Sequence, residues 1–129
     1  MSRAGRIAPL SYAVRPHVLG RFLGEVFVAV AGLTIVPLAV ALATGDLRFA
    51  LDLGLCVGVL AGMGVPLLRL RLRERIQTNE ALAVIGLAFV LTAVVLAWPF
   101  MGAGLAPLDA FFESVSGITT TGLTMVAAP

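Results

Sequence analysis

The four residues Thr119-Thr120-Thr121-Gly122, close to the C-terminal end of the sequence, could surround a dehydrated monovalent cation with oxygen atoms. Backbone carbonyls, helped by a threonine hydroxyl, can replace the water around such an ion without the full negative charge that would trap it. Ile118 and the three threonines are β-branched, which favours an extended backbone over a helix. Gly122 can adopt a positive φ that turns successive carbonyls toward one axis. The segment therefore predicts part of an ion-selectivity filter.

A short helix over about residues 107–116 is expected to place this filter segment. Pro107 suits the first helical position, and the charge of Asp109 in the first turn favours the helix N-terminus. Gly117 is placed to end the helix. At about 1.5 Å per residue the helix would be about 15 Å long, which reaches only partway into a bilayer. Its apolar residues at helical spacing are expected to pack against the surrounding spans: Leu108, Phe111, Phe112 and Val115.

Several residues around the predicted filter are expected to support it. Ser116 and Gly117 lie at the carbonyl end of the short helix, whose negative dipole end would face the cation. Glu113 is predicted to hydrogen-bond backbone near the filter and hold its shape, with direct ligation of the ion as the alternative. Thr119 is likewise expected to support the filter. A Thr-Thr-Thr-Gly string alone is a weak indication of a filter, because the same residues also occur in ordinary loops.

The composition places the chain in a membrane. It has 129 residues, of which 60% are apolar and 12% charged, with a mean hydropathy of +1.05. Soluble domains carry about 25% charged residues. The arginines stand in blocks beside apolar segments, which argues against nucleic-acid binding. Cys56 and His17 are each single, and no nucleophile–base pair or metal cluster is evident, so neither an enzyme nor a bound cofactor is predicted.

Three apolar segments are long enough to span a bilayer as helices, over about residues 22–43, 49–68 and 81–100. A tight turn around Gly45 joins the first two, so residues 22–68 are expected to form a transmembrane helical hairpin. The fold class predicted is an all-α integral membrane protein with three transmembrane helices, then a short re-entrant pore helix and filter loop over 101–129. A face of the second span carries small residues, expected to pack closely within the chain, with a homodimer seam as the alternative: Gly54, Gly58 and Gly62.

The arginine distribution predicts the topology. Arginines are frequent in the N-terminal segment 1–21 and in the loop 69–80, whereas the turn after the first span carries only Arg48. By the positive-inside rule both Arg-rich segments are cytoplasmic. The third span then ends outside, with Trp98 near that interface, and the pore helix starts from the outer face. A multi-pass protein of the cytoplasmic (inner) membrane is expected, with Asp52 and Glu25 interpreted as interfacial residues.

The string from Asp109 to Gly122, Asp-Ala-Phe-Phe-Glu-Ser-Val-Ser-Gly-Ile-Thr-Thr-Thr-Gly, closely resembles the first pore loop of the Trk/Ktr/HKT superfamily of potassium uptake proteins, the TrkH branch in particular. The preceding Trp98-Pro99-Phe100 resembles the Leu-Pro-Phe that often ends the helix before that loop. The chain departs from the family pattern at Ile118, where Phe is frequent, and at Leu123, where Ala is frequent. Neither change removes a backbone carbonyl.

The resemblance implies four helix–pore-loop–helix repeats around one pore, preceded in TrkH-type members by a helical hairpin. It implies that four residues supply filter carbonyls to potassium: Thr120, Thr121, Gly122 and Leu123. Gly122 matches the filter glycine associated with potassium preference, where plant relatives with serine tend to prefer sodium. The resemblance further implies a homodimer, a cytosolic nucleotide-binding regulatory subunit, and the remainder of the same transporter. The chain is accordingly expected to be an N-terminal fragment supplying a quarter of the filter.

Two other functions remain open from the sequence. One is a small non-conducting membrane protein with an assembly or regulatory role, whose terminal segment would stay at the membrane surface as an amphipathic helix. The other is a pore completed by several copies of the chain. The second requires an inner lining helix, which the 129-residue sequence does not contain.

Overall fold

The computed structural model describes residues 15–70 and 77–124, so expectations about residues 1–14, 71–76 and 125–129 lie outside it. This part of the chain folds into four helices and no strands: α1 (Pro16–Thr44), α2 (Leu47–Leu68), α3 (Thr78–Gly102) and α4 (Pro107–Ile118). The three predicted spans are confirmed as long apolar helices. Each extends a little beyond its predicted bounds, because helices continue through flanking polar residues that can be hydrated.

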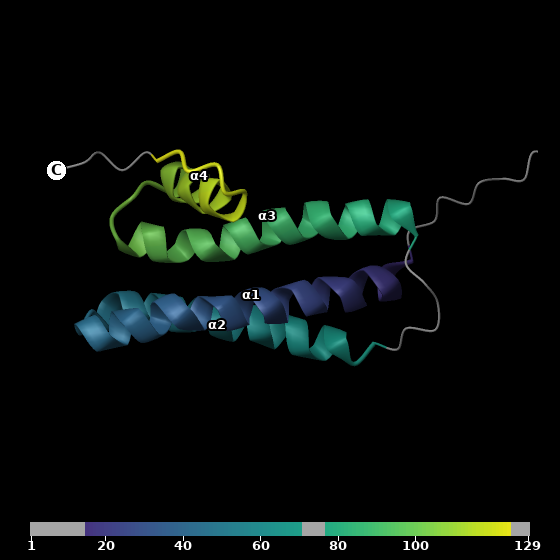
Figure 1. Cartoon of the computed structure of the whole chain (residues 1–129), viewed down its shortest axis with the longest axis horizontal. Helices are drawn as coiled ribbons and strands as arrows, with labels where there is room; N and C mark the ends of the chain where they lie inside the picture. Colours follow the sequence, from purple (N-terminus) through teal and green to yellow (C-terminus); the bar gives the residue numbers. More distant parts are fainter. Residues whose placement is uncertain (1–14, 71–76, 125–129) are drawn as a thin grey trace, which may run out of the picture.

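The three long helices run alternately in opposite directions, and the short α4 folds back along the end of α3 (Figure 1). We call the end at which α1 begins, α2 ends and α3 begins the Arg15 end. The opposite end, where α1 ends, α2 begins and α3 ends, is called the Trp98 end. The connection from α3 to α4 lies at the Trp98 end.

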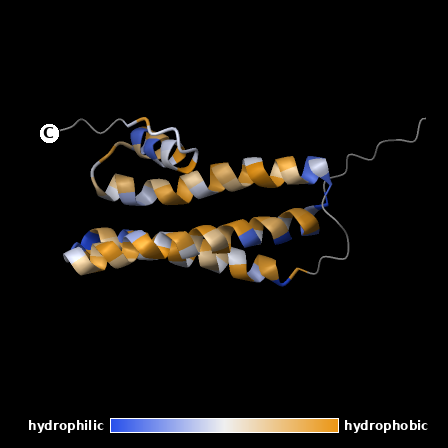
Figure 2. Cartoon of the chain, in the orientation of Figure 1, coloured by the Kyte–Doolittle hydropathy of each residue, from blue (hydrophilic) through white to orange (hydrophobic). Residues whose placement is uncertain are grey.

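Hydrophobic residues make up most of the length of all three long helices (Figure 2). α1, α2 and α3 are each long and apolar enough to cross a membrane. Many large apolar side chains on them are exposed, such as Leu33, Leu51 and Val94. A soluble protein rarely leaves contiguous apolar patches of this extent in water. The protein is therefore a multi-pass membrane protein, and these side chains face lipid or other transmembrane segments.

A turn at Gly45 joins α1 and α2, and its backbone conformation is one that favours glycine. Gly45 has a φ of 80°, and the N–H groups of Gly45 and Asp46 donate to the carbonyls of Leu42 and Ala41 at 3.3 and 3.0 Å. This pattern is a Schellman motif, in which a left-handed residue satisfies the last carbonyls of a helix. The Asp46 side chain then accepts a hydrogen bond of 3.1 Å from Phe49 N–H and caps α2.

Glycine also sets the closest approach between α1 and α2, toward the Arg15 end. A Cβ placed on Gly24 would lie 2.7 Å from Leu67 Cβ and 2.9 Å from the Gly64 carbonyl oxygen. A Cβ on Gly64 would lie 3.0 Å from the Gly24 carbonyl oxygen. Only residues without a side chain allow backbones this close, as is common between membrane helices.

The small-residue face predicted to pack within the chain does not do so among the described residues. A Cβ on Gly54, Gly58 or Gly62 would meet no atom within 4 Å. The prediction was wrong because spacing alone shows that residues share a face, and the register of the hairpin turns a different face toward α1. Gly64, two residues after Gly62, is the glycine of α2 that contacts α1.

At the Arg15 end, an ion pair joins the start of α1 to the start of α3. Arg15 Nε donates to Glu80 Oε1 at 2.8 Å, Arg15 Nη2 donates to Glu80 Oε2 at 3.0 Å, and the Glu80 side chain is only 1% exposed. Glu80 also accepts from the Gln77 backbone N–H at 2.9 Å, which caps α3. The hydrogen bond to Glu80 raises the pKa of Arg15 above its ordinary value. A charged pair of this kind holds two helix ends together in a fixed register.

Candidate functional site

The candidate site is built on α4, which packs against the last turns of α3 (Figure 1). Pro107 occupies the first turn, as predicted, and Asp109 lies in the same turn. The face turned to the rest of the protein consists of small residues, with Ala110 and Ser114 buried. Small side chains let the short helix lie close to its neighbour.

Of the large apolar side chains of α4 that were predicted to pack against the spans, Phe111 and Val115 are half-buried, whereas Leu108 and Phe112 are exposed. Leu108 is 78% exposed and Phe112 is 39% exposed. With Phe111 and Val115 they border an open apolar hollow of about 380 Å³ on the outer side of α4. The helical spacing of these residues is real, but it could not show which face of the helix meets α3. This face is available to lipid or to another protein segment.

α4 ends at Ile118, two residues after residue 116, where the position of Gly117 predicted its end. Gly117 and Ile118 are both helical, and Thr119 and Thr120 lie in a turn with φ of −84° and 55°, so the extended backbone predicted from Ile118 onward is wrong as far as Thr120. The chain turns instead through Thr120, whose N–H donates to Gly117 O at 3.2 Å, while Thr121 N–H donates to Ser116 O at 3.0 Å. These two bonds form a second Schellman motif, which satisfies the carbonyls at the end of α4.

Thr120 occupies the left-handed position of this motif, with a φ of 55°. It is the one non-glycine residue with a positive φ in the described ranges 15–70 and 77–124. A β-branched residue in this conformation is strained by about 1–3 kcal/mol, and such strain tends to collect at functional sites. Gly122 also has a positive φ, 72°, as predicted from its lack of a side chain.

After the turn, residues 121–124 run back along α4 and are tied to it by side chains. Ser116 Oγ donates to the Leu123 carbonyl at 2.6 Å, and Thr124 Oγ1 donates to Glu113 Oε1 at 2.8 Å. Thr119 Oγ1 donates to Val115 O at 2.7 Å. The structure thus brings Glu113, Ser116 and Thr119 into contact with the turn or the segment behind it, while Gly117 contributes its carbonyl to the turn.

The carbonyl oxygens of this segment fall into two groups. Leu123 O is occupied by Ser116 Oγ. In contrast, within the described residues the carbonyl oxygens of Thr120, Thr121 and Gly122 accept no hydrogen bond. Exposed carbonyls can replace the hydration shell of a monovalent cation. The role of these residues as filter ligands stays a prediction.

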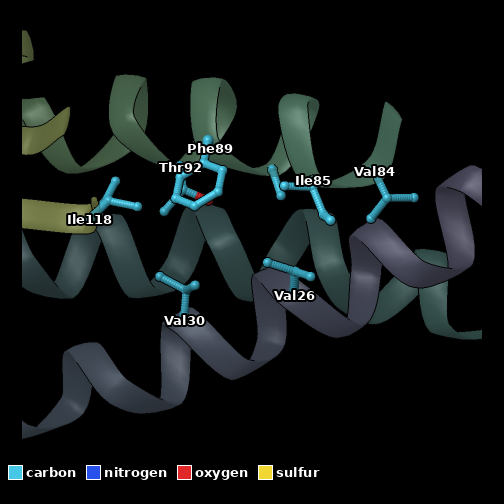
Figure 3. A pocket seen from close by; sticks show the side chains of 8 residues that line it. Val26, Val30, Val84, Ile85, Phe89, Thr92 and Ile118 are labelled. Atoms are coloured by element: carbon cyan, nitrogen blue, oxygen red, sulfur yellow. The ribbon is translucent and has the colours of Figure 1, made fainter. Parts of the chain in front are cut away.

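Next to α4, an apolar groove separates α1 from α3 (Figure 3). One part has a volume of about 300 Å³, with Val26 and Val30 of α1 facing Ile85 and Thr92 of α3 and Ile118 of α4 at one end. A second part, of about 460 Å³, continues toward the Trp98 end and includes the short helix in its wall.

Two hydroxyl groups in the walls of this groove have no hydrogen-bond partner. Thr92 and Ser114 are 2% and 3% exposed, and neither hydroxyl oxygen is paired within the described residues. By comparison, Thr34 Oγ1 donates to the Val30 carbonyl at 2.8 Å. Thr92 was not among the residues predicted from the sequence, although a hydroxyl in the middle of an apolar span is a signal for a polar contact.

Three apolar spanning helices define the chain as part of a multi-pass membrane protein. It is 30% identical over 112 residues to the Trk system potassium uptake protein TrkH of Halomonas elongata, in an alignment that covers 82% of this chain and 23% of that protein. The chain spans about a quarter of the length of this relative. No family model matches the sequence, and no solved structure matches it. The similarity supports a relationship to Trk-type potassium uptake proteins.

Proposed function

We propose that the chain contributes a pore loop to a Trk-type potassium uptake protein. α4 serves as the pore helix, and the backbone carbonyls of Thr120, Thr121 and Gly122 serve as ligands for potassium. Leu123 joins them once its carbonyl is released from Ser116. One loop provides about a quarter of a four-loop filter, so the other loops come from further polypeptide. The observation that carries this proposal is the turn after α4, which leaves the carbonyls of Thr120, Thr121 and Gly122 without hydrogen-bond partners among the described residues.

The residues around the turn support the proposal because they hold the segment without using those carbonyls. Ser116 and Glu113 bind the far end of the segment, at Leu123 and Thr124. The Thr120 turn occupies the carbonyls of Gly117 and Ser116, so these two do not compete with the segment for an ion. The similarity to TrkH of Halomonas elongata covers most of the chain, which supports the same class of function.

We further propose the membrane topology and the partners. The Arg15 end lies on the cytoplasmic side of the inner membrane, since Arg-rich segments lie next to it in the sequence. The Trp98 end is then extracytoplasmic, and α4 dips into the membrane from the side on which potassium is taken up. We also propose that the chain is part of a homodimeric transporter, which binds a cytosolic nucleotide-binding regulatory subunit.

The filter role is tested with Gly122→Ser in the gene together with the genomic region that follows it. We expect the unsubstituted gene to restore growth of a potassium-uptake-deficient strain at limiting potassium. Gly122→Ser is expected to lower the preference for potassium over sodium, because a side chain at a φ of 72° forces the carbonyls to reorient. The measurement is uptake of each ion. Gly58→Ser is the matched control, since a Cβ there meets nothing within 4 Å. An unchanged ion preference in Gly122→Ser would contradict the filter role.

A second function is favoured by one observation, the exposed apolar face of α4. A helix with large apolar side chains on an outer face can lie at the membrane surface. In that case the chain would be a non-conducting assembly or regulatory protein. Leu123→Cys separates the two functions through its reactivity with a membrane-impermeant maleimide. Under the filter proposal Leu123→Cys reacts only from the extracytoplasmic side, and potassium slows the reaction. Labelling from the cytoplasmic side, or labelling at a rate independent of potassium, favours the surface helix.

A further inference from the structure

At the Trp98 end, one carboxylate contacts two successive turns of α3. Asp52 lies near the start of α2, and its Oδ1 accepts a hydrogen bond of 3.1 Å from Trp98 Nε1. The other oxygen, Oδ2, lies so close to Gly102 that a Cβ at this position would clash with it. Trp98 and Gly102 are four residues apart and therefore share one face of α3. Asp52 thus requires an indole at one position and the absence of a side chain at the other.

The residues after Gly102 transmit this contact to α4. Only residues 103–106 connect the two helices, and they are bonded back to the last turns of α3. Ala103 N–H donates to Pro99 O at 3.0 Å, and Leu105 N–H donates to Phe100 O at 3.2 Å. Gly104 turns the chain with a φ of 98°. Because this corner is short and internally bonded, the direction of α4 follows the position of the end of α3.

A small hollow of about 100 Å³ lies under this corner. Its walls include Asp52, Gly102 and Ala103, together with the first residues of α2 and its cap. The hollow gives the corner room to move if the contact to Asp52 is lost. The other acidic group in its wall, Asp46, is engaged as the cap of α2 through Phe49 N–H.

We infer that Asp52 is a positioning residue for the candidate filter. Through Trp98 and Gly102 it fixes the end of α3 on the hairpin, and through the corner it fixes where α4 enters the membrane. The inference rests on the proposed function for the consequence in ion uptake, whereas its structural part concerns the position of α4 alone. The hairpin, which carries none of the candidate filter residues, thereby controls the geometry of the filter.

The structural part is tested by the single tryptophan of the chain, which gives one indole N–H signal in ¹⁵N-labelled protein in lipid nanodiscs. We expect Asp52→Ala and Gly102→Ala to move this signal, because each removes or displaces the acceptor of Trp98 Nε1. Asp52→Asn keeps an acceptor oxygen and is expected to restore most of the wild-type shift. Glu25→Gln is the matched control, since Glu25 pairs with Arg21 on α1, near the other end.

The position of α4 is measured with spin labels at two well-exposed sites, Leu51 on α2 and Leu108 on α4, which are 75% and 78% exposed. Leu51→Cys and Leu108→Cys are introduced together with Cys56→Ala. Double electron–electron resonance then gives the distance between the labels. We expect Asp52→Ala and Gly102→Ala to shift or broaden this distance distribution, and Glu25→Gln to leave it unchanged. An unchanged distance and indole signal in both variants would overturn the inference.

The functional consequence is read from potassium uptake by the same variants in the full gene. We expect Asp52→Ala to raise the KM for potassium by at least about tenfold, the usual effect of removing a residue that orients ion ligands. Asp52→Asn should recover most of that loss. A changed α4 distance with wild-type KM would overturn the role in the filter. If the unsubstituted protein takes up no potassium while the distances change as expected, the proposed function fails and the positioning of α4 by Asp52 stands.

Discussion

The hairpin of α1 and α2 and the pair of α3 and α4 differ in the residues that make their helix contacts and their turns. In the hairpin, Gly24 and Gly64 let the backbones touch, and Gly45 carries the left-handed turn. In the α3–α4 pair, Thr120 carries the equivalent turn, and the buried hydroxyls of Thr92 and Ser114 find no partner in the described part of the chain. Among the described residues, the strained threonine turn and both unpaired hydroxyls thus lie in the half that contains the candidate site, whereas the hairpin has one buried nitrogen without a partner, Arg21 Nη1.

This difference bears on the role of each pair of helices. Local choices that all agree with the fold make a stable unit, whereas local conflicts are tolerated mainly at functional or strained sites. The hairpin is held by its own turn and by its glycine contact. α3 and α4 border an open groove, which α1 also lines, and α4 exposes apolar side chains, so these helices are suited to contact further transmembrane segments.

The largest expected effect comes from breaking the closest contact of the hairpin. Gly24→Ala places a methyl group 2.7 Å from Leu67 Cβ and 2.9 Å from the Gly64 carbonyl oxygen, so α1 and α2 must separate. We expect a loss of about 1–3 kcal/mol, the usual cost of overpacking. The measurement is equilibrium unfolding by SDS in mixed micelles, followed by circular dichroism.

Gly58→Ala is the control for this experiment. It changes the same residue type on α2 where a Cβ meets nothing within 4 Å. We expect its stability to match or slightly exceed that of the wild type, because alanine favours helix more than glycine does. Equal losses in the two variants would show that the glycines matter through something other than the α1–α2 contact.

The next largest change in stability is expected when residues are exchanged between the two Schellman turns. One substitution should destabilise its turn and the other should stabilise it. Gly45→Thr introduces a β-branched residue at a φ of 80° and should cost about 1–2 kcal/mol. Thr120→Gly relieves the same strain and should stabilise the end of α4 by up to about 1 kcal/mol, part of the gain being offset by the entropy of glycine in the unfolded chain. Gly45→Thr is measured by SDS unfolding, and Thr120→Gly by hydrogen exchange of the α4 amides.

Relief of strain at Thr120 also bears on the candidate filter. If the strain serves the position of the carbonyls, Thr120→Gly gains local stability and loses potassium uptake. A variant that gains stability and keeps full uptake would indicate that the strained turn has no functional part.

The smallest expected effect concerns the unpaired hydroxyl in the groove. Thr92→Val removes a buried hydroxyl without a partner and should stabilise the chain by up to about 1 kcal/mol, since such a group costs about 1–3 kcal/mol. Thr34→Val is the matched control, because its hydroxyl is bonded to Val30 O and its loss should cost about 0.6 kcal/mol. Both are measured by SDS unfolding. Equal effects of the two substitutions would mean that the Thr92 hydroxyl is paired in the membrane.

Much of the fold could be predicted from the sequence. The three spans follow from the length of the apolar segments, and the turn at Gly45 from the residues that favour one. The short helix beginning at Pro107 was predicted as well. Its C-terminal end was not, because a helix can continue through Gly117 and Ile118 when hydrogen bonds further along the chain satisfy its last carbonyls.

The filter role of Thr120, Thr121 and Gly122 stays a prediction from their residue types. Ser116 and Glu113 contact the segment that follows α4, while their role in supporting a filter also stays a prediction. That the Leu123 carbonyl is occupied could not be predicted, because it depends on how the segment folds back along α4. The role of Asp52 was missed, since its partners on α3 lie 46 and 50 positions further along the sequence.

Composition and local pattern by themselves determined the medium in which this protein folds, the number of long helices and the place of the polar segment near the end. These properties depend on hydrophobicity and backbone preference, which each residue brings with it. Only the tertiary structure decided which glycines meet a neighbour, which face of α4 is covered and which acid holds Trp98. Those outcomes depend on the rotation of each helix about its axis, and that rotation is fixed by contacts between residues far apart in the chain.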